Sequence, residues 1–127
     1  MEKISVLFVC LGNICRSPAA EALFIKETKV RGIEDRFLVD SAGTGGWHVG
    51  KKADSRMRLA AKDRGINITS KARQISKNDF QQFHYILTMD ESNYKNVISL
   101  KDSEPYSDIC QVRKIQEFAN SFHEKEV

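Results

Sequence analysis

An apolar run, a short turn and a helix-forming stretch follow one another near the start of the chain. Residues 4–9 are apolar and rich in β-branched side chains, which is typical of a buried strand, and residues 18–26 have the alanine and glutamate content of a helix opening. The turn between them begins at Cys10 and ends at Arg16. A strand-to-helix turn points backbone N–H groups into one concavity at the positive end of the helix dipole. The sequence therefore predicts an α/β unit that binds a phosphate-like anion at this turn.

The residue types within the turn fit a nucleophile placed beneath a bound phosphate. Gly12 and Asn13 suit a left-handed bend, and Arg16 offers the anion a planar, two-pronged donor. N–H dipoles and a guanidinium around Cys10 favour its thiolate form, which is the nucleophilic one. The alternative is that Cys10 ends a buried strand as a small hydrophobic residue, with Cys15 paired to it or packed nearby.

A cysteine followed by five residues and Arg-Ser, the pattern of residues 10–17, closely resembles the phosphate loop of the low-molecular-weight protein tyrosine phosphatases. The resemblance implies that Cys10 attacks phosphotyrosine, that Arg16 holds the phosphate and that Ser17 hydrogen-bonds the thiolate. The phosphate-binding residues that it implies are Leu11, Gly12, Asn13, Ile14, Cys15 and Arg16.

A second motif surrounds the single tryptophan. Residues 43–50 contain four glycines and predict a loop, on which Trp47 is equally well interpreted as an exposed side chain or as a plug of the core. The pattern Gly-Thr-x-x-Trp-His-x-Gly resembles the loop that forms one wall of the phosphatase pocket. The resemblance implies that Trp47 stacks on the ring of the substrate.

Length and composition limit the class of protein. A chain of 127 residues with 41% hydrophobic and 29% charged residues is typical of one globular domain. It has no apolar run of about 20 residues and no signal peptide, which predicts a cytoplasmic protein without membrane contact. A net charge of +3 suits an anionic substrate and does not predict nucleic-acid binding. Three cysteines without metal-ligand spacing predict a reduced thiol, no metal and no cofactor.

The order of the elements predicts an α/β fold with a four-stranded parallel sheet, strand order 2-1-3-4, and helices on both faces. We expect strands at residues 3–9, 37–43, 85–89 and 112–118, and helices at 17–30, 53–64, 78–82 and after Asp90. The first helix should face the sheet with Ala19, Ala22, Leu23 and the stem of Lys26. The phosphate loop then lies at the carboxyl end of strand one, where the strand order reverses.

The general acid is the part of the family pattern that is hardest to place. In the family it is the aspartate of an Asp-Pro-Tyr loop, which Glu104-Pro105-Tyr106 resembles locally. However, residues 110–118 and 123–127 resemble the fourth strand and the segment just before that loop. This alignment predicts a single phosphatase-like domain over residues 1–127 that is incomplete at its C-terminus, without the final helix. Glu104 is then the weaker candidate, the acid is unknown, and activity should be impaired. A plain solvated turn also explains residues 104–106.

The favoured function is hydrolysis of phosphotyrosine, in a protein or a small aryl phosphate, through a cysteinyl-phosphate intermediate. A non-catalytic phosphoanion-binding protein is one alternative. An arsenate reductase is another, but it needs a downstream cysteine pair, and only Cys110 lies downstream. The uncovered sheet face predicts a possible homodimer. Asp90 should cap the helix that follows it, and the resemblance adds that it can orient Arg16.

Overall fold

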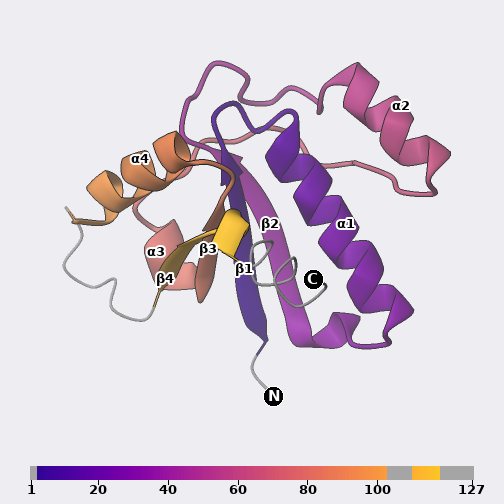
Figure 1. Cartoon of the computed structure of the whole chain (residues 1–127), viewed down its shortest axis with the longest axis horizontal. Helices are drawn as coiled ribbons and strands as arrows, with labels where there is room; N and C mark the ends of the chain where they lie inside the picture. The colour runs from indigo at the N-terminus through magenta and orange to yellow at the C-terminus, as the bar shows by residue number, and fades with distance from the viewer. Residues whose placement is uncertain (1–2, 103–109, 118–127) are drawn as a thin grey trace, which may run out of the picture.

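The computed structural model describes residues 3–102 and 110–117, which form one parallel sheet with helices on both sides (Figure 1). Its strands are β1 (Ile4–Cys10), β2 (Phe37–Gly43), β3 (Tyr85–Thr88) and β4 (Gln111–Lys114). They are hydrogen-bonded in the order β2-β1-β3-β4, and all three pairs are parallel. The predicted sheet and its strand order are thus confirmed.

The helices occupy the crossovers between the strands. They are α1 (Arg16–Val30), the 3₁₀ helix η1 (Glu34–Arg36), α2 (Ser55–Asp63), α3 (Asp79–Gln82) and α4 (Glu91–Asp102). The carboxylate of Asp54 caps α2 by accepting a hydrogen bond from the Met57 N–H at 3.3 Å. Gly65, with φ +76°, reverses the chain two residues after α2 ends.

The two faces of the central strand β1 pack against different helices, because successive side chains of a strand point to opposite sides. Leu7 and Val9 are fully buried in a cluster that includes Phe80 of α3 and Val97 of α4. On the other face the ring of Phe8 lies 5.8 Å from that of Phe24 on α1. Figure 1 shows the same division, with α1 on one side of the sheet and α3 and α4 on the other. The prediction of helices on both faces is therefore confirmed.

The face that α1 turns to the sheet differs from the predicted one. Its buried residues include Ser17, Glu21 and Thr28, whereas Leu23 is 50% exposed. The helix is turned this way because Ser17, at its start, contacts the thiol of Cys10, and positions four and eleven residues later follow on the same face. Glu21 is accommodated because the Ser41 hydroxyl donates to its carboxylate at 2.6 Å. Polar pairing, which hydropathy does not register, thus contributes to this orientation beside the packing of Phe24 on Phe8.

The strand boundaries shift slightly, and part of the predicted C-terminal structure lies outside the described residues. Strand β1 extends to Cys10, so the nucleophile candidate is the last strand residue. The last strand ends at Lys114 and residues 115–117 are helical, where we expected a strand through 118. Residues 103–109, which include Glu104, lie outside the described part of the chain. Within the described part, no helix is both long and apolar enough to cross a membrane.

Candidate active site

The loop between β1 and α1 is fixed from outside through its carbonyl groups. The carbonyl of Cys10 accepts a hydrogen bond from Thr44 N–H at 2.9 Å, and that of Leu11 accepts one from Gly45 N–H at 2.9 Å. The carbonyl of Ile14 accepts a hydrogen bond from Asp54 N–H at 2.6 Å. Because the carbonyls point outward to these partners, the peptide units are oriented with their N–H groups on the inner side of the loop.

The inner N–H groups and the start of α1 form the predicted anion site. Within residues 3–102 and 110–117, no hydrogen bond to another protein group engages the backbone N–H of Leu11, Gly12, Ile14 or Cys15. Helix α1 begins at Arg16, so its positive dipole end faces the same concavity. Free N–H groups converging at a helix N-terminus are the arrangement that binds phosphate.

The Cys10 thiol lies at the base of this loop, where it is 4% exposed. Its Sγ is 3.0 Å from Ser17 Oγ and accepts a hydrogen bond from Asn13 N–H at 3.3 Å. Ser17 is fully buried, so bulk water does not compete for its hydroxyl group. Both groups can donate to a thiolate, and hydrogen bonds to a charged group are stronger than neutral ones. The predicted meeting of Cys10 and Ser17 is found.

Asn13 has a larger role than the left-handed bend that its type predicts. Among the residues that the structure describes, Asn13 is the one non-glycine residue with a positive φ, at 57°, and it is 2% exposed. Its side-chain Nδ2 donates to Ser17 Oγ at 2.8 Å, and its Oδ1 accepts from Arg73 N–H at 2.9 Å. The side chain therefore ties the loop both to α1 and to the segment around Arg73. In the sequence, residues 66–76 resemble the family segment that runs back beneath the phosphate loop, and this resemblance is the signal that could have found the contact.

Gly43 lets β2 approach the loop closely. A Cβ atom at this position would lie 2.7 Å from the Leu11 carbonyl oxygen and 3.1 Å from Asn13 N. Both neighbours are backbone atoms, so neither can rotate away, and any side chain here would displace the loop. The sequence predicted Gly43 as the end of a strand and the start of the glycine-rich loop, but it did not predict this close approach.

Arg16 is held by the carboxylate of Asp90, the residue just before α4. Its Nη2 donates to Asp90 Oδ2 at 2.9 Å, and both side chains are partly exposed, at 49% and 37%. Asp90 Oδ1 accepts from Asn93 N–H at 2.8 Å, which makes Asp90 the cap of α4 as predicted. The Asn93 N–H and the Arg16 guanidinium hold the pKa of Asp90 below its usual value. Asp90 is thus both a cap and the residue that orients Arg16.

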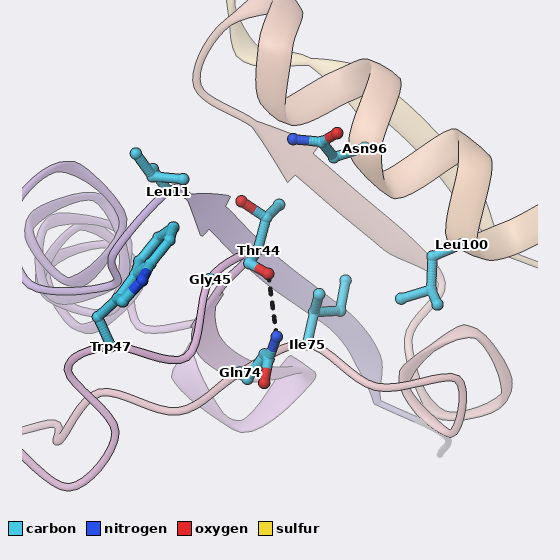
Figure 2. Close-up of a pocket in the computed structure, with 8 residues that line it drawn as sticks. All are labelled: Leu11, Thr44, Gly45, Trp47, Gln74, Ile75, Asn96 and Leu100. Carbon is cyan, nitrogen blue, oxygen red and sulfur yellow. Dashed lines mark hydrogen bonds between the residues drawn. The ribbon is translucent and has the colours of Figure 1, made fainter.

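An open cavity of about 400 Å³ adjoins the loop at Leu11 (Figure 2). Trp47 and Leu11 lie along one side of it, and Thr44, Asn96 and Leu100 belong to its remaining walls. Trp47 is 69% exposed, and its ring lies against Gly45, where a Cβ atom would be 1.9 Å from the indole. Of the two interpretations of Trp47, the exposed side chain on a loop is the one found.

Of the remaining predicted residues, the structure describes Cys15 and Cys110 but not Glu104. Cys15 is exposed at the end of the loop, while Cys110 is 1% exposed and burial raises its thiol pKa to about 11. Glu104 lies outside the described residues, so its assignment stays a prediction. Among the residues that the structure describes, no group of three or more His, Cys, Asp or Glu side chains could hold a metal ion.

Sequence comparisons point to one family. The family model for low molecular weight phosphotyrosine protein phosphatases matches residues 5–127. A relative of the same description from Schizosaccharomyces pombe is 46% identical over 120 residues, which are 94% of this chain and 75% of that protein. The human phosphatase of that description is 52% identical over 93 residues, which are 73% of this chain and 59% of the human protein.

Solved structures agree with the sequence comparisons. The structure of YfkJ from Bacillus subtilis has a TM-score of 0.85 at 38% identity, covering 93% of this chain and 73% of that one. A Drosophila arginine phosphatase has a TM-score of 0.87 at 36% identity, covering 91% of this chain and 73% of its own. The model match over residues 5–127 and the identity of these relatives show that the chain, which gathers Cys10, Arg16 and Ser17 at one loop, belongs to the low molecular weight phosphotyrosine protein phosphatase family, whose members are hydrolases.

Proposed function

We propose that this chain hydrolyses phosphotyrosine, in a protein or a small aryl phosphate, through a cysteinyl-phosphate intermediate on Cys10. The observation that carries the proposal is the buried Cys10 thiol, which sits beneath free N–H groups with the Ser17 hydroxyl 3.0 Å away. A phosphate bound to those N–H groups would have its phosphorus above the sulfur. A thiolate so placed is a nucleophile oriented for attack.

The proposed reaction has two displacements at phosphorus. In the first, the Cys10 thiolate forms an S–P bond while the P–O bond to the phenol breaks, and the phenolate takes up a proton from water. In the second, water attacks phosphorus, the S–P bond breaks, and inorganic phosphate and the thiolate are released. The loop N–H groups and Arg16 stabilise the charge on the phosphoryl oxygens in both steps. The Ser17 hydroxyl stabilises the departing thiolate in the second.

We assign Asp90 to orientation of Arg16 and not to proton donation. A general acid must carry a proton at the working pH, and the contacts of Asp90 with Asn93 N–H and Arg16 lower its pKa instead. Its carboxylate therefore stays ionised and holds the guanidinium beside the loop, where the two-pronged contact with phosphate needs it.

The cavity beside the loop supports an aromatic substrate. A tyrosyl ring leaving the loop would pass between Leu11 and the exposed indole of Trp47. Aromatic pairs contribute about 0.5–1.5 kcal/mol beyond the burial of their area. The guanidinium of phosphoarginine, the substrate class suggested by the Drosophila arginine phosphatase, would meet the same wall, so both classes belong in the test.

The test is a rapid-quench experiment with enzyme in excess over a phosphotyrosine peptide, a phosphoarginine peptide or an aryl phosphate. We expect release of the leaving group, phenol or arginine, in a single turnover and a phosphorylated peptide containing Cys10, both lost in Cys10→Ser. Phosphate binding without any such release would favour the phosphoanion-binding alternative. Arsenate-dependent thiol oxidation would favour an arsenate reductase, against which the burial of Cys110 and its pKa of about 11 already count. The cytoplasmic location and the homodimer stay predictions.

A further inference from the structure

Three charged side chains meet beside the phosphate loop, outside the residues assigned to catalysis. Arg73 donates from Nε to Asp40 Oδ2 at 3.0 Å, and from Nη1 and Nη2 to the two carboxylate oxygens of Asp79 at 3.1 and 3.0 Å. The Asp79 side chain is only 5% exposed and also accepts from Ser76 N–H at 2.8 Å. Burial opposes the charge on Arg73, but the contacts with Asp79 and then Asp40 outweigh it and raise the pKa of Arg73.

The backbone of the same arginine reaches the loop. Its N–H donates to Asn13 Oδ1 at 2.9 Å, and its carbonyl accepts from Gly43 N–H at 2.8 Å. Asn13 is the left-handed residue of the loop, and its own N–H donates to Cys10 Sγ at 3.3 Å. Arg73 thus contacts α3 and β2 through its side chain and the loop through its main chain.

We propose that Arg73 is a positioning residue for the phosphate loop, held by Asp79 and Asp40 and acting on the Cys10 thiol through Asn13. The inference rests on the proposed use of Cys10 as nucleophile. A bidentate pair between a half-buried arginine and a buried carboxylate has a fixed geometry, which a point charge on a flexible stem does not reproduce. Fixing the Arg73 backbone fixes Asn13 Oδ1, the atom that accepts the hydrogen bond from Arg73 N–H. That in turn aligns the Asn13 N–H with the sulfur and its Nδ2 with Ser17.

A purely structural ion pair would behave differently from a positioning one. If the pair only stabilised the fold, its loss would lower the free energy of unfolding and leave folded molecules with an unchanged thiol. If Arg73 positions Asn13, folded molecules should lose donors to the thiolate and to the anion. Two measurements on the intact chain read this without turnover: the pH profile of Cys10 alkylation by iodoacetamide, and protection of Cys10 by inorganic phosphate.

The main variant is Arg73→Lys, which keeps the charge and loses the two-pronged contact, and Asp79→Asn tests the other side of the pair. For folded protein we expect Cys10 alkylation at mildly acidic pH to be about tenfold slower and phosphate to bind about tenfold more weakly. Arg31→Lys is the matched control, because Arg31 pairs with Glu27 at the exposed far end of α1 and should change neither value.

The outcomes separate this inference from the proposed function. If the unaltered chain shows neither selective Cys10 alkylation nor phosphate protection, the proposed function fails. If the unaltered chain shows both and the folded variants match it, only the role of Arg73 is overturned. Should Arg73→Lys and Asp79→Asn not fold, Asp40→Asn decides by the same readouts, since Asp40 is 42% exposed and its replacement leaves the Asp79 contact in place. There we expect a change of about threefold, and no change would overturn the proposal.

Discussion

Replacing Ser17 by alanine tests the electrostatic core of the site with the loss of a single oxygen atom. Ser17 Oγ is 3.0 Å from Cys10 Sγ, accepts from Asn13 Nδ2 at 2.8 Å and lies 3.4 Å from the Ala42 carbonyl oxygen. In the thiol form the Ser17 proton can turn to Ala42, and in the thiolate form it can turn to the sulfur. The hydroxyl is therefore a donor that the ionised nucleophile can recruit without moving any heavy atom.

Two free energies follow from these contacts. A hydrogen bond to a charged group contributes about 1.5–3 kcal/mol, so losing the donor to the thiolate should slow alkylation of Cys10 at mildly acidic pH by about 10- to 150-fold. The Asn13 amide, which is 2% exposed, would also lose its acceptor. An unpaired buried donor costs about 1–3 kcal/mol, which should appear as a matching loss in the free energy of unfolding.

The assay combines iodoacetamide alkylation, followed by peptide mass, with urea unfolding of the same samples. Ser55→Ala is the control, because Ser55 is an exposed serine in the first turn of α2 and makes neither contact. Ser17→Ala should lower both the alkylation rate and the free energy of unfolding, whereas Ser55→Ala should change the alkylation rate not at all. A folded Ser17→Ala protein whose Cys10 reacts at the unaltered rate would refute the assignment of Ser17 as the thiolate donor.

Three further changes test the anion site, the cavity and the buried carboxyl. Arg16→Lys keeps the charge but loses the planar fork, so a titration should show phosphate binding weakened by about 1–3 kcal/mol. Trp47→Ala should raise KM for a phosphotyrosine peptide severalfold and leave inorganic phosphate binding unchanged, because the 69% exposed indole lies beside the loop and not within it. Burial raises the pKa of Glu21, partly offset by the Ser41 hydroxyl. The folded state therefore holds that proton more tightly than the unfolded state, and the free energy of unfolding falls as pH rises from the ordinary carboxyl range through the raised pKa. Glu21→Gln should flatten this decline in urea midpoints measured across pH, and an unchanged slope would contradict the assignment.

The fold was predictable because its signals are local and repeated along the chain. A buried apolar run before a Gly-Asn turn predicts β1 and the loop, and Gly65 and Asp90 mark a helix end and a helix start as found. The sheet order follows from right-handed crossovers once the strands are placed. The loop residues from Cys10 to Ser17 were predictable for the same reason, since they are contiguous.

The side of α1 that faces the sheet was not predictable from apolar periodicity. The helix buries Ser17 and Glu21 while Leu23 stays half exposed, because polar partners on other segments satisfy these two groups, and the buried Thr28 hydroxyl donates within the helix to the Ile25 carbonyl. Those partners are distant in sequence: Ser41 lies 20 residues from Glu21. A hydropathy pattern contains no information about such pairs, and an isolated charged residue in a helix is ordinarily exposed. Arg73 was missed for the same reason, since its contacts with Asp40 and Asp79 join three separate segments.

The phosphate loop is supported by polar groups that lie outside it, and the convergence of its N–H groups is the reason. N–H groups directed at one point repel one another when no anion is bound, so the loop needs support beyond the internal hydrogen bonds that Asn13 makes to Cys10 and Ser17. Its carbonyls are instead bound by Thr44, Gly45 and Asp54, and the Asn13 side chain is bound by Arg73. Each of these partners lies on a segment that is fixed independently, by β2, by the start of α2 or by the Arg73–Asp79 pair. The cost of gathering the N–H groups is thus met during folding, before any anion binds. Weakening a support far from the sulfur should therefore lower anion affinity and thiolate reactivity together, whereas removing Trp47 should lower neither.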